Sequence, residues 1–247
     1  RRVLNRQPLY AQIFAHMQTE AMADHRHDFR LQDILPPHSD KVFITADGQD
    51  LKMLTIPGLY TYNGYHGFFV KKGLRYVKQS LKENWVLNNY AADQDKDLPR
   101  LHDDLQKLYF DQYEKQWRGL IQNLKVRKAR GISQEIQILD ILSGPETPLR
   151  SLMQAIEKNT TLYRPAKPAQ AVEKAKKTAG ATTPGSVADP LFQKETTPIQ
   201  ALELEKRFQD IHYLVRSSGD APPPLDNLLA NLNSVRDFMM QIGSAAD

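Results

Sequence analysis

The chain has 247 residues, of which 40% are hydrophobic and 25% are charged, and its formal net charge is +4 at pH 7. This composition is typical of a globular domain and excludes collagen, a wholly disordered chain and a bare coiled coil. The absence of cysteine excludes a disulfide scaffold, a zinc finger, an iron–sulfur site and a thiol nucleophile. No run of apolar residues approaches the roughly 18 that a membrane-spanning helix needs, so we expect no span here. Since the first residue is Arg1, we expect the chain to be a piece of a longer one.

The excess of positive charge comes mostly from residues 164–190, which hold five basic and two acidic side chains. This stretch is rich in Ala, Lys and Pro and has no Phe, Tyr or Trp. Such a composition buries too little apolar surface to offset the entropy of ordering, which predicts a linker. Nucleic-acid binding is not favoured, because no aromatic side chain is available to stack on a base.

The N-terminal third combines one helix with the clearest β pattern. A helix is predicted to open at Gln7-Pro8, because Tyr10, Ile13 and Met17 then share one face. Two apolar runs follow, on either side of the turn dipeptide Asp47-Gly48. Together they predict a β-hairpin over residues 41–56.

Six more helices are predicted downstream, each from apolar side chains at helical spacing. Their starts are marked by capping residues or prolines such as Asp97, Ser133 and Thr147. Both tryptophans, Trp85 and Trp117, fall on long stripes and are expected to be buried. The stripes begin at Val70, Leu101, Ile136, Leu149, Ala201 and Leu225.

These patterns predict a mainly α-helical fold with a bundle-like domain. We expect a helical domain over residues 1–163 that contains the β-hairpin at 41–56. An Ala/Pro/Lys-rich linker over 164–196 follows, and then an antiparallel helix pair over 197–247. Because their connection is short, these last two helices should pack on each other and on, or as a continuation of, the first domain.

The inventory of chemically active patterns argues against an enzyme. The aspartates Asp93, Asp95 and Asp97 lack the Gly and Glu of an EF-hand. His25 and His27 stand two apart, and no HExxH, GxSxG, SxxK or Walker A pattern occurs. We therefore predict no catalytic residue, no cofactor-binding residue and no metal site, although an active site without a local signature stays an alternative.

One stretch, residues 56–65, is rich in Gly and Tyr and joins the predicted hairpin to a helix. Tyrosine has an apolar ring and a polar hydroxyl, which suits it to protein interfaces. Tyr60, Tyr62 and Tyr65 are therefore candidates for contact with a partner. The competing interpretation is a packed corner, in which Gly permits a tight turn.

The same stretch begins a set of motifs that together resemble the IcmF/TssM family. The resemblance covers most of residues 1–161 and resumes from about 199 to 242. Its motifs are Ile56-Pro57-Gly58-Leu59-Tyr60-Thr61, Gly64-Tyr65 with Phe68, Glu83-Asn84-Trp85-Val86-Leu87, Leu108-Tyr109 with Tyr113 and Trp117, Ser143-Gly144-Pro145 with Pro148-Leu149, and Leu225-Asp226-Asn227-Leu228-Leu229.

Members of this family are large inner-membrane subunits of the type VI secretion system, with relatives in type IVB secretion. The resemblance implies that the chain is a helical, structural portion of their periplasmic part, anchored through the inner membrane of a Gram-negative bacterium. It implies as partners an outer-membrane lipoprotein, an inner-membrane subunit similar to DotU/TssL, and other copies of the same protein. The family's nucleotide-binding motif has no counterpart here, and its β-rich lipoprotein-docking domain is expected after Asp247.

Two alternatives to a secretion-system segment stay open at this point. One is a cytoplasmic helical adaptor, and the other is an enzyme with a non-local active site. A recess with convergent polar groups of perturbed pKa would favour the enzyme.

Overall fold

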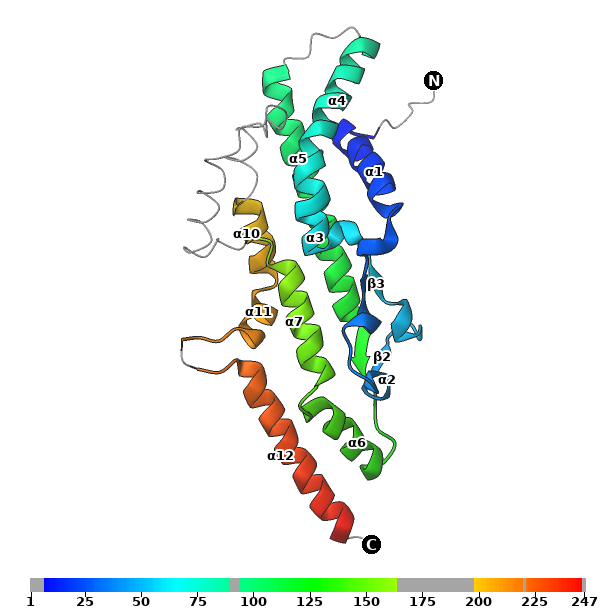
Figure 1. The fold of residues 1–247 in the computed structure, drawn as a ribbon, viewed down its shortest axis with the longest axis vertical. Helices are drawn as coiled ribbons and strands as arrows, with labels where there is room; N and C mark the ends of the chain where they lie inside the picture. Colours follow the sequence, from blue (N-terminus) through cyan, green and yellow to red (C-terminus); the bar gives the residue numbers. More distant parts are fainter. Residues whose placement is uncertain (1–6, 89–93, 164–197, 220, 246–247) are drawn as a thin grey trace, which may run out of the picture.

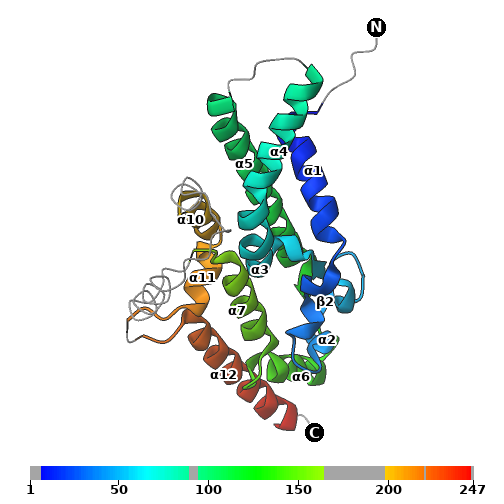
Figure 2. The ribbon, with the colours of Figure 1, turned by 45° about the horizontal axis from the view of Figure 1, so that its top comes forward.

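The structure, a computed structural model, describes residues 7–88, 94–163, 198–219 and 221–245. The linker predicted over 164–196 and the aspartate Asp93 lie outside these residues. The predicted mainly α-helical fold is confirmed. The molecule is elongated: α1, α4 and the start of α5 form one end, and α6 and α12 form the other (Figures 1 and 2).

Helices make up most of the described chain, and short strands and 3-10 turns join them. The α-helices are α1 (Leu9–Met22), α2 (Ser39–Val42), α3 (Tyr62–Gly64), α4 (Val70–Asn88), α5 (Gln94–Asn123), α6 (Ile132–Ser143), α7 (Pro148–Thr160), α10 (Pro198–Arg207), α11 (Gln209–Val215) and α12 (Pro224–Ala245). The 3-10 turns are η1 (His25–His27), η2 (Leu31–Asp33), η3 (Leu51–Met53) and η4 (Gly58–Tyr60), and η5 (Tyr65–Phe69) is a π-helical segment. The strands are β1 (Phe29–Arg30), β2 (Phe43–Thr45), β3 (Thr55–Ile56) and β4 (Leu124–Val126).

The β structure consists of two antiparallel pairs rather than the local hairpin expected over residues 41–56. Strands do form in that segment, but β2 pairs with β4 and β3 pairs with β1. The turn at Gly48 is present, with φ of 76°. The chain then leaves into η3, because Asn123 binds the turn: its carbonyl oxygen accepts from Ala46 N at 2.7 Å and its side-chain Oδ1 from the same nitrogen at 3.0 Å. Contacts with a distant segment thus replace the local pairing.

The long helix α5 carries the centre of the core, as its apolar stripe predicts. Leu105, Tyr109, Tyr113 and Trp117 are each 0% exposed. Buried side chains from α1 through α10 join them in one hydrophobic cluster. The helix begins three residues before Asp97, the predicted cap. The side chain of Trp85, expected to be buried as well, lies outside the described part of the chain.

The helices after residue 197 were expected to pack on each other as a pair. They pack mainly on the helices of the body, and α11 also contacts α12. The helix α10 lies on α5 and buries Ala201 and Leu204 in the common core, which Phe208, between α10 and α11, also joins. Two ion pairs hold its end, from Arg207 to Glu114 at 2.5 Å and to Asp111 at 3.3 Å. The helix α11 lies on α7, and α12 lies mainly on α6.

A buried histidine fixes α11 on α7. The Thr160 hydroxyl donates to the Ile156 carbonyl at 2.7 Å, so His212 Nε2, 2.6 Å away, donates to that hydroxyl. Burial, with the nearby Arg216 guanidinium, lowers the pKa of His212. Arg216 itself bridges Glu157 at 3.0 Å and Glu205 at 2.7 Å.

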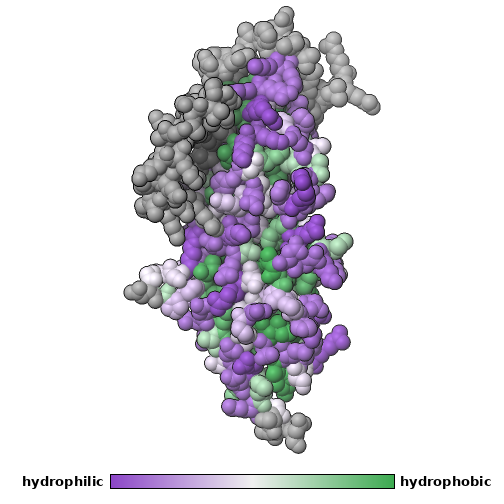
Figure 3. Space-filling model, in the orientation of Figure 1, coloured by the Kyte–Doolittle hydropathy of each residue, from purple (hydrophilic) through white to green (hydrophobic). Residues whose placement is uncertain are grey.

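The outer surface is mostly hydrophilic on the face shown in Figure 3, with hydrophobic patches between the polar side chains. Of the helices within the described residues, none combines the length and the apolar character needed to cross a bilayer.

The burial of Trp117 yields a prediction about stability. Its Nε1 donates to the Tyr60 carbonyl at 2.8 Å, and its ring packs on Phe29 with 5.0 Å between the ring centroids. Trp117→Ala removes both contacts and should lower the free energy of unfolding by about 3–5 kcal/mol. Trp117→Phe keeps most of the ring but orphans the carbonyl, so we expect a smaller loss of about 1–3 kcal/mol. Chemical denaturation measures both; a loss below about 1 kcal/mol for the alanine variant would contradict the assigned core.

Candidate functional site

The Gly- and Tyr-rich corner, residues 57–65, turns the chain from β3 into the helical segment that ends as α4. Its first turn is η4, and Thr61 caps the helix that follows. The Thr61 hydroxyl donates to the Gly58 carbonyl at 2.7 Å and accepts from Gly64 N at 3.1 Å. Thr61 is therefore the N-cap of this helix.

Two glycines allow the chain to approach itself closely here. A Cβ on Gly64 would lie 1.9 Å from the Gly58 carbonyl oxygen, and a Cβ on Gly58 would lie 2.9 Å from the His27 carbonyl carbon. The Asp28 carboxylate accepts from Gly58 N at 2.7 Å, which joins the corner to the segment after α1. The sequence needs Gly at both positions because no side chain fits.

Three aromatic side chains of α5 donate hydrogen bonds to main-chain carbonyls in and beside the corner. The Tyr109 hydroxyl donates to Leu59 O at 2.8 Å, and Trp117 Nε1 donates to Tyr60 O. The Tyr113 hydroxyl donates to Asn159 O on α7 at 2.6 Å. The Asn159 side chain in turn accepts from Tyr62 N at 3.1 Å. The corner is thus held between α5 and α7.

The three candidate tyrosines differ in accessibility. Tyr60 and Tyr65 are 0% and 2% exposed, whereas Tyr62 is half-buried. The Tyr60 hydroxyl accepts from Gln18 Nε2 at 2.7 Å, while the Tyr65 hydroxyl has no hydrogen-bond partner among the residues that the structure describes. Burial raises the pKa of both Tyr60 and Tyr65 above that of an exposed tyrosine. Because these two rings fill the core, the packed-corner interpretation describes them better, and Tyr62 is the one of the three that a partner can reach.

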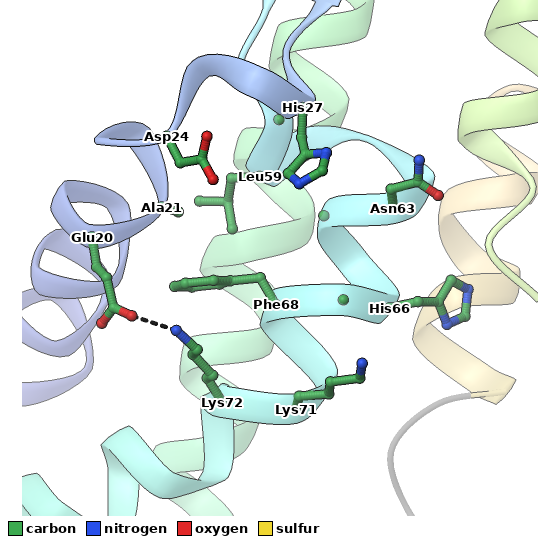
Figure 4. A pocket seen from close by; sticks show the side chains of 13 residues that line it. Glu20, Ala21, Asp24, His27, Leu59, Asn63, His66, Phe68, Lys71 and Lys72 are labelled. Carbon is green, nitrogen blue, oxygen red and sulfur yellow. Dashed lines mark hydrogen bonds and ion pairs between the residues drawn. The ribbon is translucent and has the colours of Figure 1, made fainter.

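A recess of about 770 Å³ opens beside the corner, between the end of α1 and the segment from α3 to α4. Its polar lining includes side chains that sequence reasoning did not bring together (Figure 4). The labelled polar side chains around it are Glu20, Asp24, His27, Asn63, His66, Lys71 and Lys72. The two segments are some forty residues apart in sequence, so no local pattern pointed to this recess.

Most of the charged groups around the recess are already paired. Lys72 forms an ion pair with Glu20 and lies over the Phe68 ring, 4.6 Å from its centroid. Arg26 binds the Asp24 carboxylate at 2.8 Å and holds the pKa of that carboxyl well below its usual range. Burial lowers the pKa of His66, whose Nε2 lies 2.9 Å from the Leu162 carbonyl oxygen.

The side chains around the recess can be compared with those of known kinds of catalytic and metal sites. Among the described residues that line the recess there is no Ser, Thr, Tyr or Cys, and the two carboxylates, Glu20 and Asp24, are ion-paired with Lys72 and Arg26. Within the described residues, no three His, Cys, Asp or Glu side chains gather as metal ligands. What the recess offers is a rim of mixed charge around an apolar floor formed by Leu59 and Phe68.

Comparisons with known proteins agree with the motifs around the corner. The sequence profile of the IcmF-related family, described as "Intracellular multiplication and human macrophage-killing", matches residues 1–161. The type VI secretion system component TssM1 of Pseudomonas aeruginosa is 29% identical over 252 residues, and the match spans 95% of this chain and 22% of TssM1. A solved type VI secretion system membrane core complex chain shares the fold, with a TM-score of 0.61 and 16% identity over 98% of this chain and 38% of that one.

The close approach at the corner predicts which glycine the fold needs. Gly64→Ala should lower the free energy of unfolding by about 3 kcal/mol or more, because the new Cβ meets a main-chain oxygen that cannot move aside. Gly119→Ala, in α5 with no atom within 4 Å of its Cβ, is the matched control and should raise stability by about 0.5–1 kcal/mol. Thermal unfolding of both variants tests the pair, and equal effects would contradict the geometry of the corner.

Proposed function

This chain belongs to the IcmF-related family, and we propose that it is a structural, non-catalytic segment of a subunit of a type VI secretion system membrane complex. The observation that carries the proposal is the similarity to TssM1, which runs through 95% of this chain. The fold shared with a membrane core complex chain agrees with it. The chain spans 22% of the length of TssM1, so the proposal concerns one segment of such a subunit.

We further propose that the segment lies in the periplasm and helps to bridge inner- and outer-membrane components. Its elongated helical body, held by one core, suits a part that spans a gap. The proposed partners are an outer-membrane lipoprotein, an inner-membrane subunit similar to DotU/TssL, and other copies of the same protein. The recess beside the corner is the surface we assign to contact with one of them, together with Tyr62, whose ring packs on His66 of the recess lining.

The absence of cysteine makes the proposed compartment directly testable. Lys115 is exposed on α5, so Lys115→Cys places one thiol on the surface. In the full-length protein, with its other cysteines replaced, this thiol should react in intact cells with a maleimide that cannot cross the inner membrane. The same protein without the substitution is the control. Labelling that requires disruption of the inner membrane would instead support a cytoplasmic adaptor.

The contact role proposed for the corner predicts a defect in assembly without a defect in folding. Tyr62→Ala in the full-length protein should lower co-purification of the membrane-complex partners about tenfold, since truncating an interface tyrosine often costs ~1.4 kcal/mol or more. Tyr213→Ala removes a ring that is 66% exposed on α11 and serves as the matched control.

Thermal unfolding and the cellular amount of each variant accompany this measurement. The contact role fails if Tyr62→Ala assembles normally, or if assembly falls only in proportion to the folded protein.

A further inference from the structure

The outer edge of β4 is an unpaired strand edge. The ladder with β2 uses Arg127 N, which donates to Val42 O at 2.6 Å, and Asn123 O, which accepts from Ala46 N. Val126 stands opposite Phe43, between these bonded positions, so its N–H and C=O point away from β2. Neither group is hydrogen-bonded to any part of the chain that the structure describes. Such an edge is a template on which another extended chain can pair.

Four cationic side chains accompany this edge within six residues: Lys125, Arg127, Lys128 and Arg130. All four are exposed, and they line a groove of about 950 Å³ together with Ile44 and Gln134. Arg127 donates to the Asp40 carbonyl at 3.0 Å, which is a main-chain oxygen and not a carboxylate.

None of the four forms an ion pair with a carboxylate of the described residues. The other arginines that organise this fold behave differently, since Arg118, Arg207 and Arg216 all bind glutamates. Within the described residues, no carboxylate therefore pairs with the positive charge of the groove, and this charge favours an acidic partner.

We propose that the β4 edge and its groove bind an extended acidic segment of another protein, which adds as a third strand to the β2–β4 pair. The unpaired N–H and C=O favour a polypeptide over a lipid or a nucleic acid, because a main chain is what a strand edge recognises. The cations add the preference for carboxylates. The proposed function includes neither an acidic, extended partner segment nor the β4 edge.

The geometry of β4 also predicts the order of acidic and apolar residues in the bound segment. Side chains of a strand alternate between two faces, so Lys125 and Arg127 share one face and Val126 lies on the other. Residues directly opposite each other in neighbouring strands share a face. The bound segment should therefore alternate acidic and apolar residues, with its carboxylates facing Lys125 and Arg127.

The experiment measures binding of a fluorescent, end-blocked octapeptide of alternating Glu and Val to the whole 247-residue chain. Two further peptides carry the same side chains but have N-methyl groups on all the Val nitrogens or on all the Glu nitrogens. In an added strand one of these sets faces β4, so one methylated peptide should bind about tenfold more weakly although its charge is unchanged.

Variants of the chain separate the edge from general charge. Lys125→Glu with Lys128→Glu should weaken binding of the unmodified peptide about tenfold or more. The control, Lys107→Glu with Lys115→Glu, makes the same change in net charge on exposed positions of α5 and should alter binding less than about twofold. Val126→Pro removes the outward N–H without touching the ladder to β2, and it should weaken peptide binding as N-methylation does.

Each other outcome overturns the proposal. If the peptide does not bind, or both charge-reversed chains lose affinity equally, the groove has no specific acidic partner. If both methylated peptides bind as well as the parent and vesicles containing phosphatidylglycerol bind as tightly, the surface is a site for anionic headgroups. If charge reversal causes self-association with peptide binding unchanged, the cations only protect the edge. Thermal unfolding of every variant identifies any that fail to fold. The methylated peptides are tested on the unaltered chain, so they show whether binding uses main-chain hydrogen bonds even if a variant fails to fold.

Discussion

Hydrogen bonds from the aromatic face of α5 to main-chain carbonyls are the interaction on which the rest of the structure depends. A buried carbonyl without a donor costs about 1–3 kcal/mol, and the corner places two of them, Leu59 O and Tyr60 O, inside the core. Tyr109 and Trp117 supply the donors, and Tyr113 does the same for Asn159 on α7. These side chains therefore fill the core with their rings while they satisfy the polar main chain of two other segments. The close contact between Gly58 and Gly64 in the same turn is possible because neither residue has a side chain.

The aromatic stripe shows how far the sequence could predict this arrangement. A spacing of four residues between Tyr109, Tyr113 and Trp117 predicts one buried helix face, and the structure confirms it. The spacing does not say which carbonyl each polar tip reaches, because the acceptors lie some fifty residues away in the chain. The strand pairing was missed for the same reason. The dipeptide Asp47-Gly48 does form a turn. Asn123, which bonds to this turn, lies far along the chain, so the residues around the dipeptide do not predict these bonds.

The two candidate surfaces differ in what sequence could reveal about them. The recess beside the corner joins the end of α1 to the start of α4, so its members appear unrelated until the chain folds. The basic run from Lys125 to Arg130 is visible in the sequence. Its setting was not visible, because a strand of three residues is too short to stand out by alternation. The register with β2 is what exposes the outer N–H and C=O of Val126.

The residues that stabilise the fold differ from the residues that are available for contact with a partner. Tyr60 and Tyr65 belong to the core, so a change at either acts first on folding, and any loss of assembly would follow from the lost folded protein. The β4 edge depends less on the core, since the outward N–H and C=O of Val126 bond to no described residue, and the Arg127 side chain reaches only the Asp40 main-chain carbonyl among the described residues. A subunit built in this way can keep a rigid body constant while its partner-binding edges change. The corner and the basic edge therefore meet different constraints, one from packing and the other from recognition.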